Sequence, residues 1–412
     1  MKAAIISVGS ELVCGHTVDS NASWLSRELT DIGIPTVRHS CVGDDERGLA
    51  DTVAQSAALA EVVLVTGGIG PTPDDITRQA VARAAGVELT VNESVLRRIE
   101  ERFSSWGRRM SANNRIQAFF PQGAEVIENA RGTAAGFAVK AGTSEVIVLP
   151  GVPAEMKSMW VEHVRGRLAC RVSSAIASGS VDCFGRGESD ITAELHDLMA
   201  PGRNPAVGDT AEDAIIRIRI CAAADTIQEA SALLERDRVE ITRRLGEIVF
   251  GNDGESLQGA VVKALVGRKK TLSTAESCTG GLLSGAVTEV PGASACFLEG
   301  ITAYHNDAKV RLLGVSRALI EKHGAVSEEV AGAMAEGARR LSGADYALST
   351  TGIAGPSGGT PDKPVGLVSI AATSSERTIC RTLHLRGDRA TVRDRTVKHA
   401  LNLLRIAFLS ER

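Results

Sequence analysis

Hydrophobic positions along the first part of the chain alternate between short apolar runs and longer stretches with helical spacing. Residues 3–9 (AAIISVG) form the kind of apolar run that is typical of a strand buried on both faces, and residues 21–33 carry apolar positions at helical spacing. The same change from strand to helix recurs at 62–77 and at 145–160. Strands that alternate with helices predict a mostly parallel sheet covered on both faces.

The pattern changes in the middle of the chain and then returns. Residues 214–224 alternate like a half-exposed strand, and residues 226–246 have the pattern of a charged helix. The polar stretch at 249–257 is the expected linker to a second series of strands and helices. We therefore expect the α/β class, with two α/β domains of mostly parallel sheets joined by a small α+β module, and boundaries at 1–168, 169–252 and 253–412.

Composition agrees with this class and narrows the choice of partners. A chain of 412 residues exceeds one ordinary core, and 42 glycines with 3% aromatic residues favour strand–helix turns over an aromatic-rich sandwich. The formal net charge of −4, without a basic run interleaved with aromatics, gives no electrostatic reason to expect a nucleic-acid partner.

The eight cysteines are too scattered for the pair spacing of a zinc site, which favours reduced thiols in a cytoplasmic protein. The first residues turn polar after a short apolar run, so no secretion signal is expected. No apolar run approaches the length of a membrane span. We expect a soluble, cytoplasmic protein with no membrane partner.

Loops at the carboxyl ends of parallel strands are where ligands bind in such folds. In the loop 66–77, Gly67, Gly68 and Gly70 would let backbone amides approach a phosphate, and the acidic pair that follows could hold a hard cation. The alternative is that one of this pair, Asp74 or Asp75, caps a helix. No Gly-Lys-Ser/Thr closes the loop, so it is not a Walker A motif. Glu11 follows the first strand in the same way, either as a metal ligand or as a helix-start carboxylate.

A second candidate lies at 275–281 (AESCTGG), between a predicted strand and a predicted helix. Ser277 and Cys278 are both possible nucleophiles, and oxyanion donors could come from the amides of Thr279, Gly280 and Gly281. The alternative is a turn whose glycines only permit close packing.

Sequence spacing does not identify the base that would activate this nucleophile. Lys309 could serve if it is partly desolvated, with Tyr304 nearby in the chain. His305, His323, His384 and His399 remain alternatives by residue type. A further glycine-rich strand end at 349–359 suits a phosphate or a sugar.

Long motifs in the same order resemble the CinA family (competence/damage-inducible protein A) over essentially the whole chain. In the first domain, the similarity is to the molybdopterin-binding fold, through SVGSELVCG, TGGIGPTPDDIT and LPGVPAEMK. The middle FGRGESDI also fits the family. In the last domain, the similarity is to nicotinamide-mononucleotide (NMN) amidohydrolases, through AESCTGG, YHNDAKVRLLGV, TGIAGPSGG and GDRATVR.

For the C-terminal domain, the resemblance implies a deamidase that converts NMN to nicotinate mononucleotide and ammonia. It implies Ser277 as the nucleophile and Lys309 as its partner, with no metal. Cys278 is then a core residue. The implied substrate-site residues include an arginine, for which Arg393 is preferred to Arg389, and also Tyr304, Thr351, Gly352, Ala354 and Gly355.

For the N-terminal domain, the resemblance implies hydrolysis of ADP-ribose to AMP and ribose 5-phosphate with a divalent metal (Mg, Mn or Co), and potassium as a further candidate ion. The implied metal ligands are Asp74, Asp75 and Glu11, with Asp44 as a weaker candidate. A module that binds molybdopterin or a nucleotide without hydrolysis is the alternative.

The expected partners are therefore the small molecules NMN and ADP-ribose, with no nucleic acid and no membrane. A third interpretation, a competence or recombination factor, is disfavoured by the acidic net charge. Two linked sites and a middle module lead us to expect a homodimer.

Overall fold

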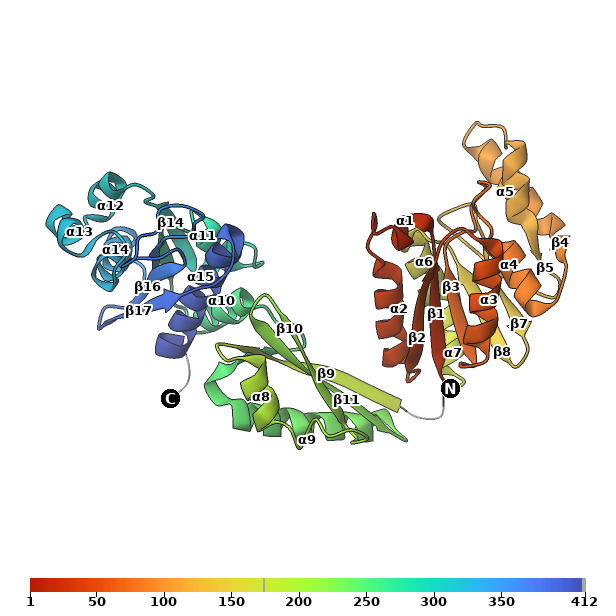
Figure 1. Ribbon diagram of the computed structural model, residues 1–412, viewed down its shortest axis with the longest axis horizontal. Coiled ribbons are helices and arrows are strands. Elements are labelled where there is room, and N and C mark those ends of the chain that lie inside the picture. The colour runs from red at the N-terminus through yellow and green to blue at the C-terminus, as the bar shows by residue number, and fades with distance from the viewer. Residues whose placement is uncertain (173–174, 410–412) are drawn as a thin grey trace. The chain divides into compact units, whose positions relative to one another are not determined.

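The computed structural model describes residues 1–172 and 175–409. By its internal contacts the chain separates into two compact units. One consists of Met1–Ser178 with Ala222–Leu233, and the other of Gly179–Cys221 with Leu234–Arg412. Both have the α/β character that the hydrophobic pattern predicts (Figure 1).

The first unit is built around a six-stranded sheet in the order β2-β1-β3-β8-β7-β6. Its first four strands pair in parallel, and β7 and β6 are added antiparallel. Helices lie on both faces of this sheet (Figure 1). The strands are Ala3–Val8 (β1), Thr36–Val42 (β2), Val62–Thr66 (β3), Glu125–Ile127 (β6), Gly136–Ala141 (β7) and Ser144–Leu149 (β8).

Side chains of the central strands alternate between two apolar clusters, one on each face of the sheet. Ile6 and Val63 pack into one cluster, whereas Ile5 and Leu64 pack into the other, beside Trp160. Burial on both faces explains why these strands appear in the sequence as unbroken apolar runs.

The helices of this unit are α1 to α7, together with a π-helical turn and a 3-10 helix, and a separate antiparallel pair of short strands completes it. Their bounds are Ser10–Val13 (α1), Ser20–Asp31 (α2), Glu46–Ala57 (α3), Thr77–Ala85 (α4), Glu93–Ser105 (α5), Pro153–Met159 (α6), Arg165–Ala169 (α7), Trp160–Val164 (η2), Ala112–Ala118 (η1), Leu89–Val91 (β4) and Phe119–Pro121 (β5).

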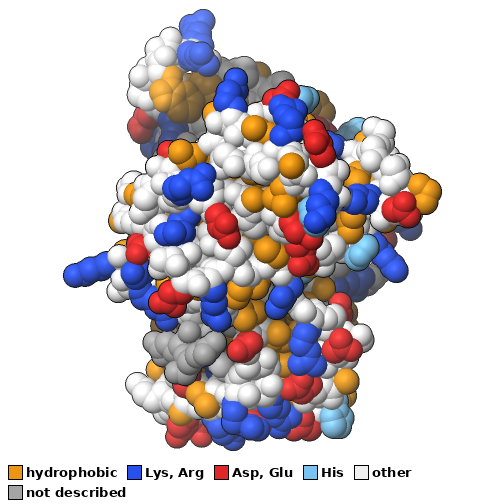
Figure 2. All heavy atoms as spheres, turned by 90° about the vertical axis from the view of Figure 1, so that its left-hand side faces the viewer, with side chains coloured by type: hydrophobic (Ala, Val, Ile, Leu, Met, Phe, Trp, Pro, Cys, Tyr) orange, Lys and Arg blue, Asp and Glu red, His pale blue; other side chains and the backbone are white. Residues whose placement is uncertain are grey.

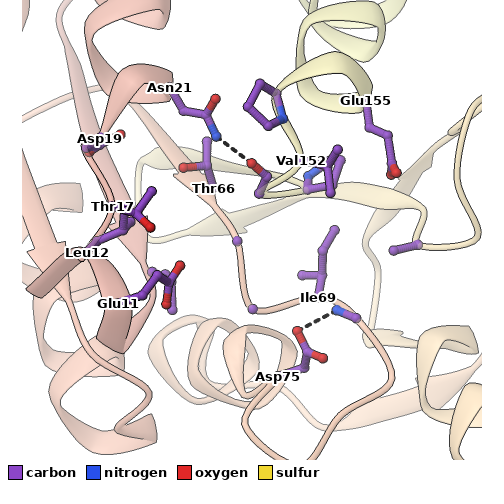
Figure 3. A pocket seen from close by; sticks show the side chains of 18 of the residues that line it. Glu11, Leu12, Thr17, Asp19, Asn21, Thr66, Ile69, Asp75, Val152 and Glu155 are labelled. Atoms are coloured by element: carbon purple, nitrogen blue, oxygen red, sulfur yellow. Dashed lines mark hydrogen bonds between the residues drawn. The ribbon is translucent and has the colours of Figure 1, made fainter. Parts of the chain in front are cut away.

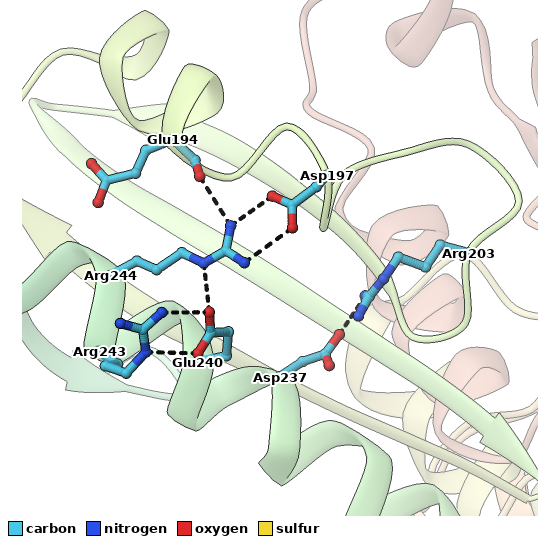
Figure 4. Close-up of polar contacts among 7 residues, drawn as sticks. All are labelled: Glu194, Asp197, Arg203, Asp237, Glu240, Arg243 and Arg244. Atoms are coloured by element: carbon cyan, nitrogen blue, oxygen red, sulfur yellow. Dashed lines mark hydrogen bonds and ion pairs between the residues drawn. The ribbon is translucent and has the colours of Figure 1, made fainter.

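The middle of the chain forms an antiparallel sheet in the order β10-β11-β9-β12, with two helices. An ion-pair network joins the segment after the shorter helix to the longer one (Figure 4). In it, Arg244 contacts both Asp197 and Glu240, while Arg203 pairs with Asp237. The elements are Ala175–Phe184 (β9), Ala206–Glu212 (β10), Ile215–Ala224 (β11), Val249–Asn252 (β12), Glu188–Glu194 (α8), Ile227–Leu245 (α9) and Gly246–Ile248 (η3).

The linker expected at 249–257 is not observed, because this stretch belongs to the middle sheet. It begins with strand β12, which pairs antiparallel with β9, and it continues into a turn in which the Gly254 amide donates to the buried carboxylate of Asp182. The backbone groups of this stretch are thus hydrogen-bonded to the middle sheet. Its polar composition alone did not indicate this pairing.

The last part of the chain forms a five-stranded sheet in the order β14-β13-β15-β16-β17. The pairs of β13 with β14 and β15 are parallel, but β16 and β17 are antiparallel, so this sheet is less parallel than the sequence predicts. The reason is that a loop without a helix joins β15 to β16, and such a connection returns the chain antiparallel. The strands are Leu272–Glu276 (β13), Phe297–Thr302 (β14), Tyr346–Gly352 (β15), Leu367–Thr373 (β16) and Thr378–His384 (β17).

Six α-helices accompany this sheet in the described residues: Leu257–Gly267 (α10), Leu282–Thr288 (α11), Asn306–Leu313 (α12), Arg317–His323 (α13), Glu328–Ser342 (α14) and Arg389–Leu404 (α15), followed by a π-helical turn at Arg405–Leu409 (η5) and with a 3-10 turn at Ala293–Ala295 (η4). The core of this sheet extends into the middle module, because Phe184 and Phe250 belong to the same apolar cluster as the residues of α10 and α15. No helix among residues 1–172 and 175–409 has the length and apolar character that crossing a membrane requires.

Candidate functional site

The first candidate site lies where β13 ends, at the turn that carries Ser277. The Ser277 amide donates to the Thr350 carbonyl of β15 over 2.9 Å, which continues the sheet one residue beyond the strand. Gly280 and Gly281 then take φ values of 58° and 98°, in the left-handed region that favours glycine. The sequence therefore turns sharply from strand to helix at this point, and Ser277 lies at the start of the turn.

Lys309 is the side chain that faces this serine. Its Nζ lies 3.1 Å from Ser277 Oγ and 3.4 Å from both the Tyr304 carbonyl and Asn306 Oδ1. The side chain is 2% exposed, and burial lowers the pKa of the Lys309 ammonium. No carboxylate among the described residues pairs with it, so this amine can lose its proton and act as a base.

The four histidines that sequence spacing left open have other environments. His305 caps α12, with Nδ1 accepting from the Asp307 amide, and His323 pairs with Glu329. His399 packs edge to face on Phe184, and His384 is exposed at the end of β17. Among the described residues, the side chain within hydrogen-bond distance of Ser277 Oγ is that of Lys309.

Cys278, the competing nucleophile, belongs to the core. It is 5% exposed within the apolar cluster, and burial raises the pKa of its thiol to about 12. A thiol that stays protonated is a poor nucleophile.

The expected oxyanion donors need a correction. The Gly280 amide donates to the Ser277 carbonyl, and the Gly281 amide donates to the carboxylate of Glu276. Of the three predicted amides, that of Thr279 is the one with no oxygen acceptor among the described residues, and the Cys278 sulfur is its neighbour. Glu276, which the sequence did not single out, is fully buried and also accepts from the amides of Leu283 and Ser284.

The two candidate arginines have different contacts. Arg393 donates to the carbonyls of Cys278 and Thr279, so it holds the turn itself. Arg389 is exposed and donates to the Tyr304 hydroxyl and to the Gly355 carbonyl, which joins two of the predicted substrate-site residues.

The remaining predicted residues of this site lie inside the fold. The Thr351 hydroxyl donates to the Ala325 carbonyl, and Ala354 is buried in the core cluster. A Cβ at Gly352 would come within 2.7 Å of Val368 Cγ2, so this glycine permits the close approach of two strands.

The second candidate site is a cavity of about 470 Å³ in the first unit (Figure 3). It lies at the carboxyl ends of the parallel strands, as the sequence predicts. Residues that line it include Gly67, Gly68, Gly70, Glu11, Asp75, Asn21, Gln117 and Glu155.

The glycine-rich loop turns its carbonyls away from this cavity. Thr77 donates through its hydroxyl to the Gly67 carbonyl and through its amide to the Gly68 carbonyl, over 2.8 and 3.0 Å. The next amides, of Gly68 and Ile69, have no acceptor among the described residues. Paired amides of this kind form an anion-binding concavity.

The predicted metal ligands are only partly brought together. Glu11 and Asp75 both line the cavity, whereas Asp74 is exposed and lies outside its lining. Asp75 also closes the loop, because it accepts from the amides of Gly70 and Thr72 and from the Thr72 hydroxyl. Asp44 accepts from the Ser10 amide at the start of α1, which is a capping role.

Among the described residues, no group of three or more His, Cys, Asp or Glu side chains is arranged to hold a metal. Two carboxylates at a phosphate loop still suit a magnesium-type ion, which is commonly bound by one or two carboxylates with substrate phosphates. Glu11 and Asp75 therefore fit such an ion when a phosphate ligand completes its coordination.

Two amide side chains of this cavity are not among the site residues that the sequence predicts. Gln117 is 1% exposed and its Oε1 has no partner among the described residues, and Asn21 has an unpartnered Oδ1 although its Nδ2 donates to the Gly151 carbonyl. Both lie far along the chain from the glycine-rich loop, so only the fold brings them to it.

Three family models match successive parts of the chain. Residues 4–169 match a probable molybdopterin binding domain, residues 179–251 match the damage-inducible protein CinA KH domain, and residues 254–408 match the CinA C-terminal domain.

Relatives match the chain over nearly its full length. A putative competence-damage inducible protein of Clostridium botulinum (strain 657 / Type Ba4) is 40% identical, covering 98% of this chain and 99% of the relative. One of Symbiobacterium thermophilum is 42% identical, with 98% of each chain covered.

Among solved structures, the competence/damage inducible protein CihA from Agrobacterium tumefaciens is 41% identical over 37% of this chain and 93% of its own, with a TM-score of 0.36. The protein CinA from Thermoplasma acidophilum, described as of unknown function, is 32% identical over 39% of this chain and 95% of its own, with a TM-score of 0.37.

Proposed function

Since this chain belongs to the CinA family of competence-damage inducible proteins, we propose that it is a pyridine-nucleotide hydrolase whose C-terminal domain deamidates NMN. The observation that carries this proposal is the buried pair of Ser277 and Lys309, 3.1 Å apart. A serine next to a desolvated amine is an arrangement suited to acyl transfer.

The reaction uses groups of this chain alone. Lys309 Nζ takes the hydroxyl proton as Ser277 Oγ attacks the carboxamide carbon, and the Thr279 amide donates to the oxyanion that forms. The carbon–nitrogen bond breaks, Lys309 returns the proton to the leaving nitrogen, and ammonia departs. Water then attacks the serine ester, with Lys309 again as base, which releases nicotinate mononucleotide and restores the Ser277 hydroxyl.

Arg389 and Tyr304 supply the contact with the rest of this substrate. Both are exposed beside the turn, and the guanidinium already donates to the Tyr304 hydroxyl over 2.9 Å. A guanidinium that can form two parallel hydrogen bonds suits the phosphate of a mononucleotide.

Substitution of the two candidate nucleophiles tests this proposal. We expect Ser277→Ala to abolish ammonia release from NMN, because no other described hydroxyl contacts Lys309. We expect Cys278→Ala to keep most of the rate, since this thiol lies in the core. Loss of ammonia release in Cys278→Ala with retention in Ser277→Ala would assign the chemistry to the thiol instead.

For the N-terminal domain, we propose metal-dependent hydrolysis of ADP-ribose to AMP and ribose 5-phosphate. The support is the loop whose Gly68 and Ile69 amides lack acceptors, beside Glu11 and Asp75. These two carboxylates would hold a divalent ion (Mg, Mn or Co) together with the ligand's phosphates, and the ion would polarise the phosphorus–oxygen bond. Potassium is a further candidate ion.

The two acidic neighbours in this loop provide an internal comparison. We expect Asp75→Asn to remove ADP-ribose hydrolysis and Asp74→Asn to retain it, because Asp75 alone of the pair lines the cavity. A chelator should stop this activity and leave NMN deamidation unchanged. If the wild type binds ADP-ribose but releases no AMP with any of the three metals, the domain is a binding module, the alternative that a match to a molybdopterin binding domain favours.

We also propose that the partners are small molecules rather than nucleic acid, although the middle module matches a domain named KH. Several of its arginines, including Arg203 and Arg244, are held in ion pairs. On the face seen in Figure 2, Lys and Arg side chains are interspersed with Asp and Glu. Such a surface offers little to a phosphate backbone.

A further inference from the structure

A buried guanidinium lies behind the glycine-rich loop of the N-terminal cavity. Arg78 is the second residue of α4 and its side chain is fully buried. Through Nη2 it donates to the Ile69 carbonyl and through Nη1, over 3.4 Å, to the Gly70 carbonyl. It therefore contacts the loop but is not among the residues that line the cavity.

The charge of Arg78 has little compensation within the protein. No carboxylate of the described residues lies within ion-pair distance of it, and Nε has no hydrogen-bond partner there. Asp75 acts on it only at longer range, and its oxygens already accept hydrogen bonds from Gly70 and Thr72. Burial lowers the pKa of Arg78 to about 10, so the guanidinium is still charged at neutral pH.

A buried charge without a close partner is costly, and proteins retain one where a ligand compensates it. In the low dielectric of a protein interior, such a charge acts strongly on an anion several ångströms away.

Thr77 and Arg78 hold successive peptide groups of the loop. The carbonyls of Gly67 and Gly68 accept from Thr77, and those of Ile69 and Gly70 accept from Arg78. These peptide bonds are trans, so each N–H points away from its carbonyl. Thr77 holds the carbonyls of Gly67 and Gly68, so the amides of Gly68 and Ile69 in the same peptide groups face the cavity that both residues line. The peptide groups that Arg78 holds end in the Gly70 amide, which donates to Asp75, and in Pro71, which has no N–H, so Arg78 fixes the end of the loop next to these two amides.

We propose that this loop binds the diphosphate of a nucleotide, and that Arg78 is a positioning residue that fixes the end of the loop at Ile69 and Gly70 and supplies counter-charge to that ligand without a metal. This inference rests on the proposed nucleotide site of the N-terminal domain. It assigns the bound metal to the hydrolytic step and the affinity for the anion to Arg78 and the two amides.

Inorganic pyrophosphate, titrated calorimetrically into the full chain with a chelator present, tests this role. Wild type and Arg83→Met should bind equally, since Arg83 lies on the same helix but is exposed. Arg78→Met should bind at least about tenfold more weakly, because a charge and the carbonyl contacts are both lost. Arg78→Lys should be intermediate, because it restores the charge but not both contacts. Wild-type affinity in an Arg78→Met protein with an intact circular dichroism spectrum would overturn the proposal.

A second measurement needs no variant, so it decides the matter even if Arg78→Met does not fold. With a chelator present, the affinity of the wild type should rise from adenosine to AMP to ADP. If ADP binds only when a divalent metal is added, the buried guanidinium does not supply the counter-charge and the inference is wrong. These readouts are separate from hydrolysis, so a chain that binds ADP without metal but never cleaves ADP-ribose would refute the proposed activity and leave this inference standing.

Discussion

Lys309 shows how a residue suited to chemistry opposes stability. Its amine is desolvated, which lowers its pKa, and it has no carboxylate partner among the described residues. Desolvation of an unpaired ammonium disfavours the folded state, so the same burial that produces a base makes the fold less stable.

Lys309→Met should separate these two effects. We expect deamidation to fall by at least about a hundredfold, the usual scale for loss of a general base. In the wild type, the rate should rise with pH through the lowered pKa of Lys309, because the neutral amine is the active form.

The stability of the same variant follows from the same pKa. Because the folded pKa of Lys309 lies below the ordinary lysine value of 10.5, the unfolded chain binds the extra proton between these two values, and wild-type stability should rise with pH across that window. Urea unfolding should therefore show Lys309→Met to be at least as stable as wild type at neutral pH. The difference in free energy of unfolding between the two proteins should become smaller as pH rises. A pH-independent rate, or a variant that keeps its activity, would exclude Lys309 as the base.

The sequence identified Ser277 and Lys309 as candidates, and the resemblance to the family paired them. It could not distinguish the roles of Arg389 and Arg393. Both belong to the motif GDRATVR and stand one helical turn apart on α15, so the choice depends on which carbonyls each guanidinium reaches. The prediction that the Gly281 amide is an oxyanion donor was also wrong, because that amide donates to the carboxylate of Glu276, a contact that only the folded structure shows.

At the scale of elements, the connection from β13 to α11 depends on Glu276, the last residue of the strand. Its carboxylate accepts from the amides of Gly281, Leu283 and Ser284, groups that a helix start leaves without partners. A strand residue thus caps the following helix across the turn that carries the nucleophile.

Glu276→Gln tests this connection, because its amide nitrogen must face at least one backbone N–H. We expect the free energy of unfolding to fall by about 1–3 kcal/mol, the usual cost of an unsatisfied buried group. The deamidase kcat should fall by roughly tenfold as Ser277 shifts. Glu289→Gln, at the exposed end of the same helix, is the matched control for urea unfolding and kinetics. Equal stability and kcat in both variants would mean that Glu276 does not fix the turn.

The alternation of strands and helices was predictable because buried parallel strands have continuous apolar runs, as at Ala3–Val8. The direction of β16 was not predictable from such a run, since apolar composition does not distinguish parallel from antiparallel pairing. It depends on the loop at 353–366, where no helix forms.

At the scale of the whole molecule, the C-terminal sheet and the middle module share one apolar core. Phe184 and Phe250 pack with residues of α10 and α15, and Arg405 donates to the carbonyls of Glu247 and Val249. A polar stretch in the sequence suggested a linker here, but contacts between segments distant in the chain cannot be read from local composition.

Two fragments measure this shared core. A fragment that begins at Gly254 loses both phenylalanines, and we expect its free energy of unfolding to be lower by about 3 kcal/mol than that of one beginning at Gly179. The longer fragment should deamidate NMN at the full-length rate. Urea titrations followed by circular dichroism, with NMN assays of both, provide the comparison. Equal stability of the two fragments would show that the deamidase domain is independent of the middle module.

Helix α15 has consequences for recombination between relatives. Its first turns carry Arg389 and Arg393 beside the nucleophile turn, and its last turns contact the middle module through His399 and the adjoining Arg405. Sixteen residues span about 24 Å, so this one helix contacts both the nucleophile turn and the middle module. A chimera that exchanges the middle module alone would replace the residues that contact the last turns of α15. A crossover before Gly179 would keep both ends of this helix with their native neighbours.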